Sequence, residues 1–110
     1  MAFSQSKTGD VQVMRVDGQL VVGNRQELKD LIQAALTAGA RKFLLDFSQT
    51  GYIDSSGLGA LVTIAKQARE RGGDLRLAGL NDDLRALFEL TKLDTLFSIA
   101  DTPEQALDGF

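Results

Sequence analysis

Short strand-like runs alternate with amphipathic helix-like runs along this 110-residue chain, and this alternation restricts the possible fold more than any other feature. An apolar strand that is followed by a helix and then by another strand favours a right-handed crossover, and therefore a parallel sheet. The order that we read is β-β-α-β-α-β-α-β-α. We predict a single α/β domain over residues 1–110, with a mixed, mostly parallel sheet of about five strands and about four helices.

The predicted strands differ in the spacing of their apolar residues. Residues 3–7 and 11–16 are expected to form a hairpin around the turn signal Thr8-Gly9-Asp10, and VQVMRV alternates with a period close to two. Residues 42–47, KFLLDF, are almost continuously apolar, as in a central strand that is covered on both faces. The remaining predictions are strands at 74–80 and 96–100, a short extended segment at 19–21 and a loop at 48–53.

Each predicted helix begins with a residue whose side chain can cap it. Asn24 is followed by Glu27 at capping-box spacing, and Gly39 is typical of a left-handed helix end. Ile53 and Leu58 occupy the positions of a hydrophobic staple around the second helix start. The four predicted capping residues are Asn24, Asp54, Asn81 and Thr102.

Two missing residue types exclude much of enzyme chemistry. The chain contains no Cys and no His. It therefore lacks thiolate metal sites, Cys nucleophiles, and the imidazole of a Ser-His-Asp triad or of the commonest general base. A hydrolase that uses Asp46 or Asp54 is a poor alternative, because no second carboxylate is obviously placed opposite either one. We expect no enzymatic activity, no cofactor and no metal.

Charge and hydropathy bear on partners and location. Fifteen Asp and Glu against twelve Lys and Arg give a formal net charge of -3, so no basic excess is available to neutralise nucleic-acid phosphates. The start MAFSQSK lacks the apolar stretch of a signal peptide, and the uncharged run at 55–65 is shorter than the ~20 residues of a spanning helix. We expect a cytoplasmic protein that binds neither nucleic acid nor membrane, with a frayed tail beyond Leu107.

The segment YIDSSGLGAL, residues 52–61, is the most informative about function. With Asp54 as the N-cap, Ser55 and Ser56 lie in the first helical turn, near unpaired backbone N–H groups and the positive end of the helix dipole. Gly57 and Gly59 would let another surface approach the backbone closely. A phosphate at this place would be tolerated electrostatically.

From these residues alone, ordinary helix capping is favoured over a phosphorylation site. Two glycines early in a helix cost about 1 kcal/mol each relative to Ala, which suggests a role beyond capping without identifying it. The segment is no dinucleotide fingerprint, because Val62 stands where a third Gly or Ala is needed, and the chain has no P-loop. It is no nucleophile elbow either, because Ile53 replaces the first Gly and no His is present.

Two long segments carry a family resemblance. LLDFSQTGYIDSSGLGALVTI and GGDLRLAGLNDDLRALFELTKLDTLFSI resemble the STAS domain of bacterial anti-sigma factor antagonists, and the similarity extends over nearly the whole chain. In that family a partner, an ATP-dependent serine kinase that also binds a sigma factor, phosphorylates the first Ser after the Asp. The unphosphorylated antagonist binds this anti-sigma factor serine kinase and frees the sigma factor, and a metal-dependent serine phosphatase reverses the modification.

The resemblance implies that Ser55 is the phosphate acceptor, with Ser56 as the second choice. Family members often carry acidic residues in a Gly-Glu-Leu-Asp segment, whereas this chain reads Gly18-Gln19-Leu20-Val21, so we expect an apolar contact there. The alternative reading is a STAS scaffold or small-ligand-binding regulatory module that never accepts phosphate. The predicted partner-binding residues are Val21, Val22, Asn24, Asp54, Ser55, Ser56, Gly57 and Leu58.

Overall fold

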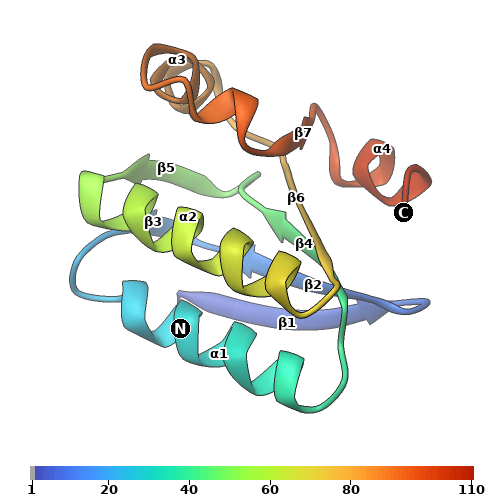
Figure 1. Cartoon of the computed structure of the whole chain (residues 1–110). Helices are drawn as coiled ribbons and strands as arrows, with labels where there is room; N and C mark the ends of the chain where they lie inside the picture. Colours follow the sequence, from blue (N-terminus) through green and yellow to red (C-terminus); the bar gives the residue numbers. More distant parts are fainter. Residues whose placement is uncertain (1) are drawn as a thin grey trace.

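A five-stranded sheet forms the centre of the computed structural model, which describes residues 2–110 (Figure 1). The strand order is β1-β2-β4-β6-β7, with β1 antiparallel to β2 and all other neighbours parallel. The predicted mixed, mostly parallel α/β domain is confirmed. The strands are β1 (Phe3–Thr8), β2 (Val11–Val16), β4 (Lys42–Asp46), β6 (Asp74–Ala78) and β7 (Ser98–Ala100).

Helices cover the two faces of this sheet unequally. The helices α1 (Arg25–Thr37) and α2 (Ser55–Glu70) lie side by side over one face, whereas only the short α4 (Pro103–Asp108) packs on the other (Figure 1). The helix α3 (Asp82–Leu90) follows β6, and a 3-10 turn at Leu93–Thr95 leads into β7. The four predicted helices are therefore present.

The central strand β4 contributes to two separate cores, because successive strand residues point to opposite faces. Phe43 and Leu45 are fully buried in the larger core beneath α1 and α2. Leu44, between them, is fully buried in a smaller core with Ala78 and Ala106, on the side of α4. The almost continuous apolar run of residues 42–47 thus correctly predicted a central strand that is covered on both faces.

The predicted loop at 48–53 is wrong, because its last four residues form a strand. β5 (Thr50–Ile53) pairs in parallel with β3 (Gly18–Leu20) and forms a separate two-stranded ribbon. The Thr50 hydroxyl, in a residue only 4% exposed, donates a 2.6 Å hydrogen bond to the Val16 carbonyl at the end of β2. This ribbon carries the chain directly into α2.

The expectation of a frayed C-terminus is also wrong. The Arg76 guanidinium on β6 donates to the carbonyl oxygens of Ala106, at 2.9 Å, and of Gly109. The Phe110 ring lies 4.1 Å from the same guanidinium, which gives a cation–π contact. Arg76 therefore ties the C-terminal end of α4 and the residues after it to the sheet.

The ion pair of Lys42 and Asp10 joins the β1–β2 turn to the start of β4 at an N–O distance of 3.0 Å. The hydrogen bond and charge of Lys42 lower the pKa of the Asp10 carboxyl below its ordinary value. Because this pair is solvent-exposed, we expect it to contribute little to stability. Within residues 2–110, no helix has the length and apolar character that crossing a bilayer requires.

Candidate functional site: the exposed start of α2

Asp54 organises the site from the N-cap position of α2. One carboxylate oxygen accepts a 2.7 Å hydrogen bond from the Gly57 backbone N–H, which is the predicted helix cap. The other accepts a 3.1 Å bond from the Val22 N–H, in the turn between β3 and α1. One side chain thus holds the α2 start and the β3–α1 turn next to each other, although they are more than thirty residues apart in sequence.

Asn24 stabilises that turn instead of capping α1, so the predicted capping box is wrong. Its side-chain oxygen accepts from the Val21 N–H at 2.9 Å, and its amide nitrogen donates to the Gln19 carbonyl at 2.9 Å. No hydrogen bond joins the side chain to the first turn of α1. The amide is occupied by the backbone that precedes the helix, as Asn side chains often are in turns.

Ser55 and Ser56 occupy the first turn of α2, as predicted. Ser55 is exposed and Ser56 is partly exposed. The positive end of the helix dipole and the first backbone N–H groups lie at the same place, and they favour negative charge. The Ser55 hydroxyl is therefore accessible to another protein, and a phosphate there would face the positive end of its own helix.

Two of the predicted partner-binding residues lie inside the protein. Gly57 is buried, and a Cβ built on it would come within 2.4 Å of the Leu20 carbonyl oxygen. Leu58 is 9% exposed and belongs to the larger core. Gly57 thus serves the close approach of α2 to β3, whereas Gly59 is exposed, with open space around the place of a Cβ.

Exposed apolar side chains flank the serines. Val22 is 65% exposed, and Tyr52 on β5 is 57% exposed. Aromatic side chains such as that of Tyr52 are enriched in protein–protein interfaces relative to the rest of a protein surface. Tyr52 was missed in the sequence, and its only signal was the strand-favouring character of Thr50, Tyr52 and Ile53 in a segment that lacked a visible strand partner.

This site has no arrangement that suggests metal chemistry or catalysis. Within the described part of the chain, no group of three or more Asp and Glu side chains comes together as metal ligands could. Asp46, at the end of β4, accepts hydrogen bonds from the backbone N–H and the hydroxyl of Ser48. Its carboxylate therefore caps the loop after the strand.

Comparison with known proteins identifies the class. Residues 3–106 match the STAS domain family, and the chain belongs to that family. It is 28% identical over 110 residues to BtrV of Bordetella bronchiseptica, a protein named as a candidate anti-sigma factor antagonist, with 100% of this chain and 95% of that protein covered. It is 29% identical over 91 residues to the anti-sigma-B factor antagonist of Staphylococcus aureus, with 83% and 84% covered.

Solved structures agree with this placement. A candidate anti-sigma factor antagonist from Thermotoga maritima superposes with a TM-score of 0.91 at 29% identity, over 97% of this chain and 92% of that one. The phosphorylated form of the Bacillus cell fate determinant SpoIIAA gives 0.75 at 25% identity, over 97% of both chains. The family and the names of these relatives place the chain among regulatory proteins without enzymatic activity.

Proposed function

We propose that this protein is an anti-sigma factor antagonist whose binding is switched by phosphorylation of Ser55. The unmodified protein binds an anti-sigma factor serine kinase and so releases the sigma factor. The observation that carries the proposal is the exposed Ser55 at the α2 start, beside the exposed apolar side chains of Val22 and Tyr52. The names of the relatives support the antagonist role, and a phosphorylated relative of the same fold supports the switch.

The contact surface that we propose combines the α2 start with the turn that Asp54 holds beside it. Val22 and Tyr52 would supply apolar contact. This fits a chain that has Gln19 and Val21 where family members often carry acidic residues. We exclude the buried Gly57 and Leu58 from this surface and add Tyr52. The remaining predicted residues, which we retain, are Val21, Val22, Asn24, Asp54, Ser55 and Ser56.

Phosphorylation would act locally, without refolding the domain. A phosphate adds about -1.5 to -2 charge, and inside a protein contact it must lose water and can meet like charge. Moving a partner from 99:1 bound to 1:99 requires about 5.5 kcal/mol. A phosphate at the centre of an interface can approach this value, and the Asp54 carboxylate in the neighbouring position adds to the repulsion that a partner carboxylate would meet.

The same proposal names the other members of the circuit. A metal-dependent serine phosphatase would remove the phosphate and restore binding. The switch would operate in the cytoplasm, where sigma factors meet RNA polymerase. Neither step requires a metal or cofactor on this chain.

The test compares binding of an anti-sigma factor kinase from the same bacterium to three proteins: unmodified, Ser55→Ala and Ser55→Asp. We expect Ser55→Ala to bind like the unmodified protein and Ser55→Asp to bind at least about 100-fold more weakly, which is about 2.7 kcal/mol. Ser6→Asp is the matched control, because it adds the same charge at an exposed serine on β1. It should bind like the unmodified protein.

Mass spectrometry then locates the phosphate. After incubation with the kinase and ATP, trypsin should release residues 43–66 as one peptide, because Lys42 and Lys66 bound a stretch without Lys or Arg. We expect one phosphate on this peptide at Ser55, and none in the Ser55→Ala protein. Equal binding of Ser55→Asp and Ser55→Ala, together with an unmodified peptide, would contradict the switch and favour a STAS module that does not accept phosphate.

A further inference from the structure

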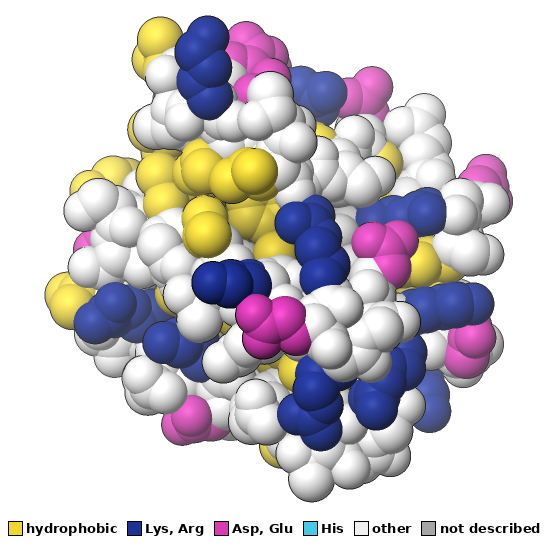
Figure 2. All heavy atoms as spheres, viewed as in Figure 1, with side chains coloured by type: hydrophobic (Ala, Val, Ile, Leu, Met, Phe, Trp, Pro, Cys, Tyr) yellow, Lys and Arg dark blue, Asp and Glu magenta, His cyan; other side chains and the backbone are white. Residues whose placement is uncertain are grey.

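A shallow apolar groove lies on α2, two to four turns beyond Ser55. Its volume is about 290 Å³, and its apolar lining comes from Val62 and Ala65 on α2 and from Leu96 and Phe97 just before β7. Leu96 is 45% exposed, although its neighbour Phe97 is buried. Figure 2 shows the corresponding apolar patch on the helical face of the molecule, with basic side chains at its edge.

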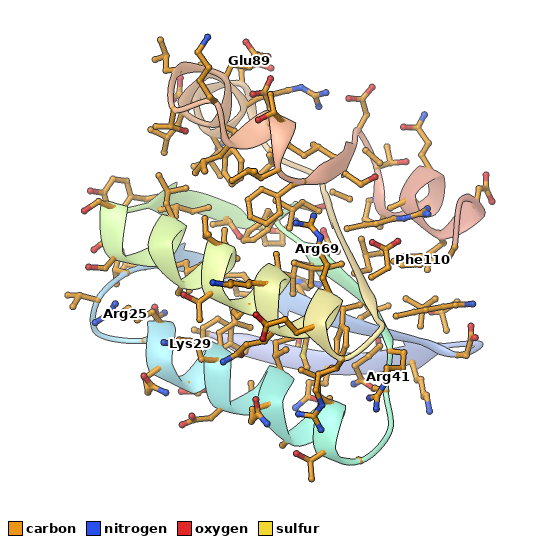
Figure 3. The ribbon with its side chains drawn as sticks, viewed as in Figure 1. Arg25, Lys29, Arg41, Arg69, Glu89 and Phe110 are labelled. Atoms are coloured by element: carbon orange, nitrogen blue, oxygen red, sulfur yellow. The ribbon has the colours of Figure 1, made fainter. Side chains whose placement is uncertain are left out.

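The rim of this groove is mainly basic. Lys66 and Arg69 border it together with a single acid, Glu70. The Arg69 guanidinium donates to the Leu96 carbonyl at 2.5 Å, so it is fixed at the edge of the groove, where Figure 3 labels it. None of these three side chains takes part in an ion pair within residues 2–110. Their charges are available to another molecule.

A feature complementary to the groove stands on α3. Leu90 is 82% exposed, the highest value among the exposed large apolar residues of the described chain. It belongs to a helix with the exposed acids Asp82, Asp83 and Glu89, none of which forms an ion pair in residues 2–110. Glu89 adjoins Leu90, and the exposed Lys92 follows two residues later, whereas Asp82 and Asp83 stand at the other end of the helix. Residues 82–94 still have an acidic excess, with four Asp and Glu against two Lys and Arg. An exposed apolar side chain thus lies in an acidic segment, and the apolar groove has a mainly basic rim.

The charge of the whole chain is divided in the same way. Residues 81–110 contain seven Asp and Glu but only two Lys and Arg, a formal charge of -5. Residues 1–80 contain eight acidic and ten basic side chains, a formal charge of +2. Leu96 and Phe97 of the groove belong to the acidic segment, but its rim residues Lys66 and Arg69 belong to residues 1–80. The acidic segment that carries Leu90 is therefore attracted to this rim on a second molecule, and such complementarity selects orientation in a contact.

We propose that this protein self-associates, with Leu90 of one copy in the α2 groove of a second copy and its acidic neighbours beside Lys66 and Arg69. The groove and Leu90 are different surfaces of one molecule, so the contact is heterologous and builds open chains or closed rings. The contact is small, and we expect weak association with a dissociation constant of about 0.1 mM. It involves neither Ser55 nor a kinase, so it stands or falls independently of the proposed function.

The test is sedimentation equilibrium of the full chain between low micromolar and millimolar concentration. The wild type should show a weight-average mass that rises with concentration, and added salt should reduce this rise because it screens the charges around Leu90. Leu90→Gln, Lys66→Glu and Arg69→Glu should each weaken association at least about 10-fold. Lys66→Glu does not remove the hydrogen bond from Arg69 to the Leu96 carbonyl. Its effect on association would therefore not arise from movement of the segment before β7.

Mixing two variants distinguishes this specific contact from nonspecific association. The Leu90→Gln protein keeps an intact groove, and the Lys66→Glu protein keeps an intact Leu90. Each should be monomeric alone at 0.1 mM, the concentration of about half association expected for the wild type. An equimolar mixture should form one-to-one dimers but no longer assemblies, because each pair has one working contact.

Two control variants make the same chemical changes elsewhere. Val22→Gln removes another exposed apolar side chain, and Lys29→Glu reverses an α1 charge outside the groove. Both should associate like the wild type. A wild type that is monomeric at 1 mM, controls that lose association as fully as the groove variants, or a mixture that remains monomeric would each overturn the proposal.

Discussion

Two glycines in the first two turns of α2 have opposite roles, although the sequence presents them as a pair. A Cβ on Gly57 would lie 2.4 Å from the Leu20 carbonyl oxygen and 2.9 Å from Ile53 Cγ2. A Cβ on Gly59 would meet nothing within 4 Å. Gly57 is thus required where α2 crosses the β3–β5 ribbon, and Gly59 is not required for packing.

Alanine substitution should separate these roles. We expect Gly57→Ala to destabilise the protein by about 1–3 kcal/mol, because the clash with backbone outweighs the gain in helix propensity. Gly59→Ala should instead stabilise it by about 0.5–1 kcal/mol. Urea denaturation followed by circular dichroism measures both values. Equal effects of the two variants would contradict the assigned crossing of α2 and β3.

Single residues were predictable from sequence where their partners are local. The side chains of Asp54, Asn81 and Thr102 accept from backbone N–H groups three residues later, as their helix-start patterns indicated. Asn24 has a similar pattern, but competing backbone groups at Gln19 and Val21 take its amide. Capping signals identify a helix start more reliably than they identify the partner of the side chain.

At the scale of elements, the ribbon of β3 and β5 could not be read from the sequence. Each strand has at most four residues, and their pairing joins segments about thirty residues apart. The evidence for β5 is tertiary: Thr50 donates to Val16, and the Asn81 side chain at the α3 start donates to the Thr50 carbonyl at 3.4 Å. Because β5 leads directly into Asp54, these bonds also position Ser55.

Replacing Thr50 tests how strongly the ribbon is held. Thr50→Val keeps the shape of the side chain but removes the hydroxyl that donates to Val16. We expect a loss of about 1–3 kcal/mol in the free energy of unfolding, since a buried carbonyl loses a hydrogen-bond donor. Thr63→Val is the control, because its hydroxyl bonds to Gly59 on an exposed helical turn, and it should change stability by less than about 0.5 kcal/mol.

A loss no larger in Thr50→Val than in Thr63→Val would contradict the role of Thr50. The ribbon would then be held by its own ladder and by the packing of Leu20 and Ile53.

For the molecule as a whole, the sequence predicted the layers of sheet and helices but not the α2 groove or the docking of the C-terminus. Alternating strands and helices indicated the sheet, and near-continuous apolar character indicated that β4 is covered on both faces. The α2 groove could not be predicted, because Val62 and Leu96 meet only after the chain folds. The docking of the C-terminus depends likewise on Arg76, which reads as an ordinary polar position in an alternating strand.

The contacts of Arg76 hold α4 and the C-terminal residues on the sheet face opposite α1 and α2, and they are independent of the packing of those two helices. The Arg76 guanidinium binds two carbonyl oxygens of the C-terminal segment and the Phe110 ring, and its Nε lies 3.4 Å from the Asp74 carboxylate. Leu44 and Val11 on this face are covered by Ala106, Leu107 and Phe110. The other face, with α1 and α2, has its own core and does not use these contacts.

Arg76→Met should therefore loosen α4 without loosening α1 or α2. Met keeps an unbranched apolar stem but loses the charged hydrogen bonds, each worth about 1.5–3 kcal/mol. We expect amide hydrogen exchange in α4 to accelerate by about 10-fold to 100-fold, with unchanged rates in the buried turns of α2. Arg85→Met breaks an exposed pair with Asp101 and should leave α4 exchange unchanged. Equal acceleration throughout the chain would show that the two faces unfold together, and unchanged α4 rates would show that apolar packing alone holds the helix.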